Sequence, residues 1–108
     1  MKMPGGGLER MLMQQLQNLQ ASAEKMQSEL KEFRLEASAG GGMVTAAANG
    51  LAELLEVKIS PEVVDPADVE LLQDLVLAAV KEVLAKAREL QAEKTSLLTG
   101  GLNLPGLF

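Results

Sequence analysis

Side chains that commonly perform chemistry are scarce in this chain of 108 residues. It contains no Cys and no His, so it lacks thiol nucleophiles, thiolate metal ligands and the usual general base near neutral pH. None of its serines lies in a sequence context that activates a hydroxyl, although a Ser–Lys arrangement stays open; they are Ser22, Ser28, Ser38, Ser60 and Ser96. We therefore expect a protein that is not an enzyme and uses no cofactor.

Two further groups of residues suggest ligands. Four carboxylates lie close together in the sequence and could bind a metal: Asp65, Asp68, Glu70 and Asp74. They lack the 12-residue pattern of a calcium loop, so capping of a helix and a solvated acidic surface are favoured. The glycines at 40–42 suggest a phosphate loop, but such loops lead into a helix and carry a Lys with Ser or Thr. A turn between strands is favoured instead.

Acidic residues are concentrated in the middle of the sequence. The net charge is −5. Residues 53–74 contain seven acids and one base, whereas the rest of the chain contains eight acids and nine bases. The flanking segments are therefore close to neutral, and the overall charge does not exclude a polyanionic partner.

Apolar periodicity predicts a long helix on each side of this middle region. The first pattern has alternating steps of four and three residues, at Leu12, Leu16, Leu19, Ala23, Met26, Leu30 and Phe33. It predicts a helix over residues 8–32 after a flexible tail at 1–7. The second pattern, at Leu72, Val76, Ala79, Val83, Ala87 and Leu90, predicts a helix over 65–98, ended by Gly100-Gly101 and followed by a tail at 99–108. We interpret both stripes as core.

Alternating residues between the helices predict three strands within residues 33–60. The third strand, 54–60, has Leu55, Val57 and Ile59 on one face, and Asn49-Gly50 predicts a type I′ hairpin turn with positive φ at both residues. The expected architecture is a single α+β domain over 1–108: long helix, three-stranded antiparallel meander, long helix. The helices are expected to lie antiparallel as a two-helix arm, and pairing across a two-fold axis would cover the open sheet edges.

If both stripes are core, partner contact falls on the polar helix faces and the tails. Basic and amide side chains there suit contact with phosphates and base edges. The candidate residues for such contact are Lys2, Arg10, Gln14, Gln17, Asn18, Lys25, Lys86, Arg88 and Lys94. Because Glu24, Glu29, Glu82, Glu89 and Glu93 lie among them, the local sequence alone favours an ordinary solvated helix face.

An ordered set of segments also resembles a known family. It includes residues 11–17 (MLMQQLQ), 36–44 (EASAGGGMV), Asn49-Gly50, 57–64 (VKISPEVV), 71–80 (LLQDLVLAAV) and the LPGLF sequence at 104–108. The chain resembles the bacterial YbaB/EbfC nucleoid-associated proteins. The resemblance implies a tweezer-like homodimer with helical arms, binding double-stranded DNA with little sequence preference. It also implies a role in nucleoid organisation, with gene regulation or DNA repair as further roles.

A second hypothesis is a protein-interaction or chaperone-like clamp that grips a protein client between its arms. The acidic net charge, the six methionines and the apolar C-terminal tail favour it. A scaffold for recombination or repair proteins would combine both behaviours. The N-terminal residues lack the apolar run of a signal peptide, and no apolar stretch approaches the length of a membrane span. We expect a cytoplasmic protein with no membrane or small-molecule partner.

Overall fold

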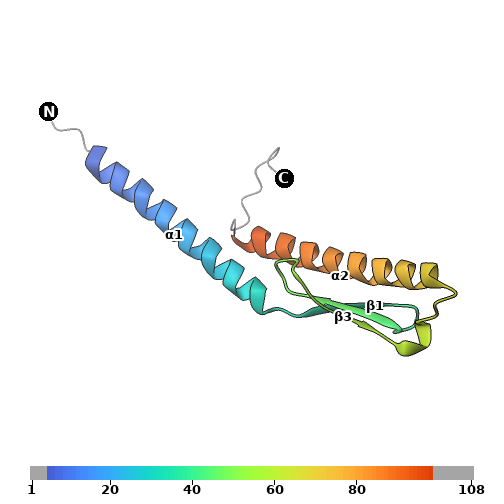
Figure 1. Cartoon of the computed structure of the whole chain (residues 1–108). Coiled ribbons are helices and arrows are strands. Elements are labelled where there is room, and N and C mark those ends of the chain that lie inside the picture. Colours follow the sequence, from blue (N-terminus) through green and yellow to red (C-terminus); the bar gives the residue numbers. More distant parts are fainter. Residues whose placement is uncertain (1–4, 99–108) are drawn as a thin grey trace, which may run out of the picture.

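The computed structural model describes residues 5–98 and contains a helix, a three-stranded sheet and a second helix in that order (Figure 1). The elements are α1 (Gly5–Glu32), β1 (Leu35–Ala39), β2 (Val44–Ala48), β3 (Leu54–Ile59), the short 3₁₀ helix η1 (Pro61–Val63) and α2 (Val69–Leu98). The strands are antiparallel in the order β1-β2-β3. The predicted fold class is therefore confirmed.

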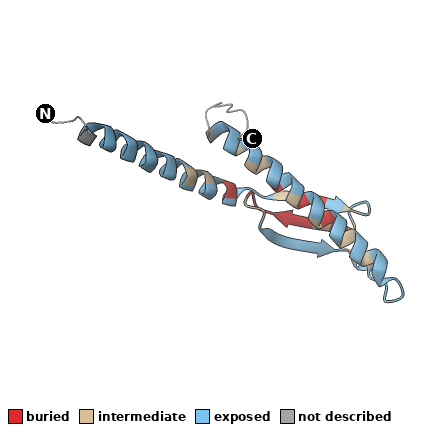
Figure 2. Cartoon of the chain, turned by 90° about the horizontal axis from the view of Figure 1, so that it is seen from above, coloured by how far each residue is buried: buried red, intermediate tan, exposed pale blue. Residues whose placement is uncertain are grey.

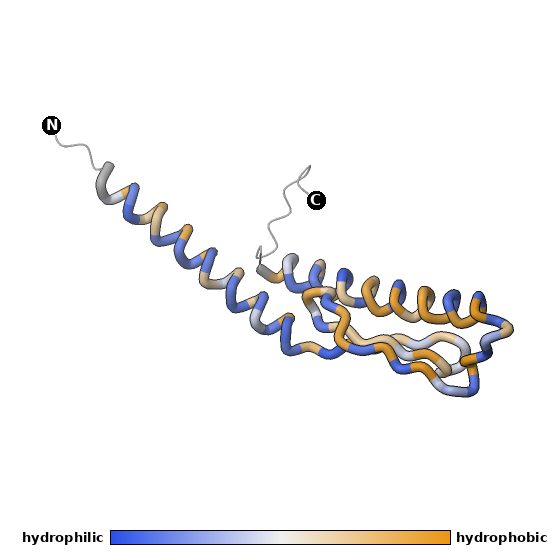
Figure 3. Tube along the Cα trace, in the orientation of Figure 1, coloured by the Kyte–Doolittle hydropathy of each residue, from blue (hydrophilic) through white to orange (hydrophobic). Residues whose placement is uncertain are grey.

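The core lies between α2 and one face of the sheet. Ala37 of β1 is paired with Ala46 of β2, which is also paired with Val57 of β3. The first two are buried, together with Val83 of α2. Small side chains on the sheet let a helix approach it closely, so a core without aromatic residues can still be well packed. The apolar side of α2 faces the sheet (Figure 3), which confirms the core interpretation of the second stripe.

The predicted packing of the two helices against each other is wrong for most of their length. Along much of its length α2 covers β1 and β2, while α1 projects away from both layers (Figure 1). Leu12, Leu16 and Leu19 are between 53% and 63% exposed, and among the large apolar residues of α1 only Leu30 is buried (Figure 2). The core interpretation of the first stripe is therefore wrong within this chain. A 3.5-residue repeat specifies an apolar seam, but it does not specify which surface covers that seam.

Gly50 joins the two helices to the turn between β2 and β3. Its backbone N–H donates to the carbonyl of Leu30 at 2.8 Å, and its own carbonyl accepts from Nε2 of Gln91 at 2.9 Å. A Cβ at this position would lie 2.6 Å from the Leu30 oxygen. Only glycine therefore permits the close approach of α1 to this turn.

Asn49 holds the same turn from inside. Its side chain is almost fully buried, and its Oδ1 accepts from the backbone N–H groups of Leu51 and Glu53, both at 3.0 Å. Its Nδ2 donates to the Glu53 carboxylate at 2.7 Å. The hairpin is confirmed, but the predicted type I′ turn is wrong, because the positive φ belongs to Ala52 and not to Asn49 or Gly50. Glycine is required at position 50 by its close contact with α1, and not by a positive φ.

Local chemistry determines where α2 begins. Oδ1 of Asp68 accepts from the N–H of Leu71 at 3.3 Å, which makes Asp68 the N-cap, and Asp65 accepts from Ala67 in the preceding turn. The helix therefore begins at Val69, four residues after the predicted start. The turn predicted at glycines 40–42 is confirmed, with positive φ at all three.

The N-terminal boundary also differs from the expectation. The structure extends α1 back to Gly5, so a flexible tail over 1–7 is wrong for glycines 5–7. Each residue added to an existing helix gains a hydrogen bond without a new nucleation cost, which offsets the poor propensity of glycine. Residues 1–4, Gly100-Gly101 and the predicted tail at 99–108 lie outside the described residues.

We expect Gly50→Ala to lower the free energy of unfolding by about 1–3 kcal/mol, because the new methyl group overlaps the backbone of Leu30. Urea denaturation followed by circular dichroism at one fixed protein concentration measures the change. Gly7→Ala is the matched control, since a Cβ there meets nothing within 4 Å. Equal stability of the two variants would contradict the spatial role assigned to Gly50.

Candidate nucleic-acid interface

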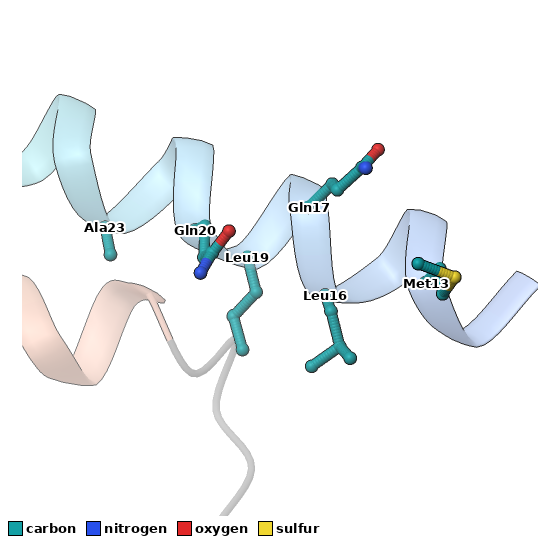
Figure 4. Close-up of a pocket in the computed structure, with 6 residues that line it drawn as sticks. All are labelled: Met13, Leu16, Gln17, Leu19, Gln20 and Ala23. Carbon is teal, nitrogen blue, oxygen red and sulfur yellow. The ribbon is translucent and has the colours of Figure 1, made fainter.

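The polar face of α1 carries five of the predicted contact residues. Arg10, Gln14, Gln17, Asn18 and Lys25 are all exposed. Their spacing places them on the side of α1 away from the apolar stripe. In Figure 4, Leu16 and Leu19 point to one side of the helix and Gln17 points to the other. Arg10 and Lys25 are separated by roughly 22 Å along the helix at 1.5 Å per residue, so this is an extended surface.

The three predicted residues on α2 differ in their surroundings. Nζ of Lys86 donates to the backbone carbonyl of Glu36 at 2.8 Å, at the outer edge of β1. Nζ of Lys94 lies 5.5 Å from the ring centroid of Phe33, within the range of a cation–π interaction. Only Arg88 is exposed without such an interaction in the described part of the chain. Lys86 and Lys94 therefore help to hold α2 against neighbouring segments.

Lys81 is a candidate that the sequence analysis missed. It lies seven residues before Arg88 and therefore on the same outward face of α2. Its side chain is exposed and forms no ion pair among residues 5–98. The seven-residue spacing was the available signal, and it predicts a basic line on the face of α2 opposite the sheet.

The open face of the sheet is electrically balanced instead of basic. Arg34 pairs with Glu36 at 3.1 Å and with Glu56 at 3.0 Å, and Lys58 lies 3.7 Å from Glu56. The hydrogen bond to Glu36, and to a smaller extent the one to Glu56, raises the pKa of Arg34 above its ordinary value. Ala47 lies between the two glutamates in the sheet register and is buried. These bases are therefore poor candidates for phosphate contact.

The bases of the two helices do not form a single compact patch in the described structure. Lys25 and Lys94 line a common pocket, which lies between α1 and the end of α2 and also includes Glu29. The others are spread along a molecule with extents of 84 × 27 × 17 Å. Lys2 lies outside the described residues. The candidate interface thus consists of the polar face of α1 and the outward face of α2.

Other types of site find no support in residues 5–98. No three acidic side chains in this range are close enough together to hold a metal ion. Asp65 and Asp68, considered above as metal ligands, accept hydrogen bonds from backbone N–H groups. Neither described helix combines the length and apolar character that a membrane crossing needs.

The comparison with known families is decisive. The model of the YbaB/EbfC DNA-binding family matches residues 5–102, which include both helices and the sheet. The chain belongs to the YbaB/EbfC family. The resemblance found in the sequence is therefore confirmed.

Relatives of this YbaB/EbfC chain match over almost their full length. A nucleoid-associated protein of Acetivibrio thermocellus is 54% identical over 107 residues, covering 97% of this chain and 95% of the relative. One from Thermoanaerobacter pseudethanolicus is 51% identical over 105 residues, with the same shares covered. These names indicate nucleoid-associated proteins and not enzymes.

A solved structure shares the overall fold of this chain. The crystal structure of an uncharacterized protein from Helicobacter pylori aligns with a TM-score of 0.63, over 72% of this chain and 90% of that chain. The sequences are 23% identical, so the likeness concerns the fold alone.

Proposed function

We propose that the protein binds double-stranded DNA as a homodimer, with little sequence preference, and contributes to nucleoid organisation in the cytoplasm. The match to a DNA-binding family over residues 5–102 carries this proposal. The nucleoid-associated relatives support the place of action. Effects on gene regulation or DNA repair, through recombination or repair proteins, would be secondary to this binding.

The contact surface is best formed by bases that have no partner in the described chain. Arg10, Lys25, Lys81 and Arg88 are exposed and form no ion pair among residues 5–98. Between Arg10 and Glu24, α1 carries no charged side chain, so its amides can approach phosphates without repulsion. A dimer doubles this small set of cations, and weak sequence preference follows because phosphate contacts carry no direct sequence information.

The second copy is best accommodated at β3. This strand lies at the edge of the described sheet, and its apolar residues Val57 and Ile59 are 36% and 41% exposed because α2 covers mainly β1 and β2. An exposed apolar edge strand is a ready template for pairing with another chain. Pairing of β3 with β3 of a second copy would give one continuous six-stranded sheet.

A two-fold axis at Val57 gives this pairing a complementary register. Antiparallel pairing centred there places Val57 opposite its equivalent and Glu56 opposite Lys58 of the second copy. Leu55 then lies opposite Ile59. Apolar residues meet apolar residues and opposite charges meet, both of which stabilise a cross-strand pair.

For DNA binding, we expect Arg10→Ala and Arg88→Ala each to weaken affinity for a duplex roughly fivefold to tenfold, regardless of its sequence. The slope of the salt dependence should become shallower by about one unit for each phosphate that the variant no longer neutralises. Gel shifts at two salt concentrations measure both effects.

Arg34→Ala is the control for this experiment, because its guanidinium is already paired with Glu36 and Glu56. A loss of affinity in this variant equal to that of Arg10→Ala would contradict the assigned surface. Absence of any shift by the unaltered protein at micromolar concentration and low salt would contradict DNA binding itself.

For the dimer, we expect Val57→Asp to weaken self-association roughly tenfold or more, because it brings two like charges together on the two-fold axis. Sedimentation equilibrium measures the change, and circular dichroism checks that the helices remain. Ser38→Asp on β1, the opposite edge strand, is the control. If both variants associate like the unaltered protein, the interface does not lie at β3.

The protein-clamp hypothesis remains a second candidate because the apolar stripe of α1 is exposed. Pull-down from lysate with and without nuclease separates the two functions. Under the DNA-binding proposal, we expect co-purifying proteins to be lost when DNA is digested. Retention of a specific protein after digestion, together with its loss in a Leu16→Gln variant, would favour the clamp.

A further inference from the structure

An uncovered apolar stripe runs along α1 and is here termed the α1 stripe: Leu8, Leu12, Leu16, Leu19 and Ala23. Its leucines are between 53% and 63% exposed. A groove along it is lined by Met13, Leu16, Gln17, Leu19, Gln20 and Ala23, and most of these side chains are apolar (Figure 4). Leaving a regularly spaced row of leucines exposed to water costs free energy, so we expect an apolar segment to cover it.

The end of α2 lies next to one end of this stripe. Ser22 and Met26 of α1 line a pocket together with Lys94 and Leu97 of α2. Ala23, where the α1 stripe ends, lies between these two residues of α1. The chain that follows Leu98 therefore continues from a point beside the uncovered seam.

The ten residues that follow have the composition and the length to cover the stripe. Residues 99–108 contain four large apolar side chains and no charged one: Leu102, Leu104, Leu107 and Phe108. In an extended conformation ten residues reach roughly 33 Å. The stripe from Ala23 back to Leu8 is only about 22 Å long at 1.5 Å per residue.

We propose that residues 102–108 dock in the groove of the α1 stripe of the same chain. The leucines and Phe108 of this segment would cover Leu12, Leu16 and Leu19. Gln20, which also lines the groove, would offer amide donors and acceptors to the backbone of the extended segment. The glycines at 100 and 101 would permit the change of direction that such docking requires.

Another copy of α1 is the competing occupant, because a 4-3 seam can pack on a second helix. The tethered segment is favoured by its position. A short flexible connection gives it an effective concentration on the order of millimolar at the stripe, whereas a second copy must arrive from solution. Docking in this way would also keep the stripe from other apolar partners.

Disulfide trapping in the full chain tests the proposal, since the natural sequence contains no Cys. We expect the pair Leu16→Cys and Leu107→Cys to form an intrachain disulfide at least fivefold faster than Gln14→Cys with Leu107→Cys. Gln14 lies on the opposite face of α1 and is the matched control. Equal rates for the two pairs would overturn the proposal.

Mixing the two single-cysteine chains, Leu16→Cys and Leu107→Cys, tests whether the contact is within one chain. The mixed disulfide between the two chains should form much more slowly than the intrachain bond of the double variant, and a mixed disulfide that forms as fast would assign the groove to a segment of another copy. An independent measurement uses Phe108→Trp, because the chain has no Trp or Tyr. Its emission should be blue-shifted relative to the same probe with Leu16→Gln and Leu19→Gln, and identical spectra would overturn the proposal. Neither readout involves DNA.

Discussion

The backbone of Gly50 is bonded on one side to Leu30 of α1 and on the other to Gln91 of α2. The turn that holds it is fixed by the buried side chain of Asn49. One peptide segment thus connects the first helix, the sheet and the second helix, although these segments are far apart in the sequence. A buried polar cluster of this kind stabilises the fold when every donor and acceptor in it has a hydrogen-bond partner. In the described part of the chain, no buried side-chain polar atom lacks such a partner. The direction in which α1 leaves the domain is set at this point.

The elements of the fold could be predicted from the sequence because their signals are local. A 4-3 apolar repeat produces a helix, alternation produces a strand, and the glycines at 40–42 produce a turn, whatever the rest of the chain does. The partner of each apolar face could not be predicted in the same way. The stripe of α2 and that of α1 look alike in the sequence, yet Val83 is fully buried on the sheet while Leu16 is exposed. The difference arises from tertiary geometry that no short window contains.

For the candidate interface too, local features could be predicted from the sequence and long-range contacts could not. Periodicity correctly placed Arg10 and Arg88 on exposed helix faces, and it could also have placed Lys81. It could not indicate that Lys86 reaches the carbonyl of Glu36, fifty residues earlier, or that Lys94 lies over Phe33. Nor could composition show that Arg34 is balanced by two glutamates from different strands. Whether a base is available to a partner depends on long-range neighbours.

Acidic residues are concentrated at one end of the molecule. η1 and the first turn of α2 lie at the end of the molecule opposite the free end of α1 (Figure 1). The charge of the chain is therefore uneven along its long axis, with acids such as Glu62 and Glu70 at one pole and a helix whose charges nearly cancel at the other. A polyanion approaching such a molecule is repelled from one end, which orients it toward α1 before any contact forms.

The attachment of α1 at its last turn has a mechanical consequence. With 28 residues the helix is about 42 Å long, and its buried contact is at Leu30, two residues before its end. It is therefore a lever with its fulcrum at Leu30 and Gly50. A rotation of about 10° there moves the Gly5 end by roughly 7 Å for a rod of this length. Two such levers in one assembly would span partners of different width without any change in the sheet that joins them.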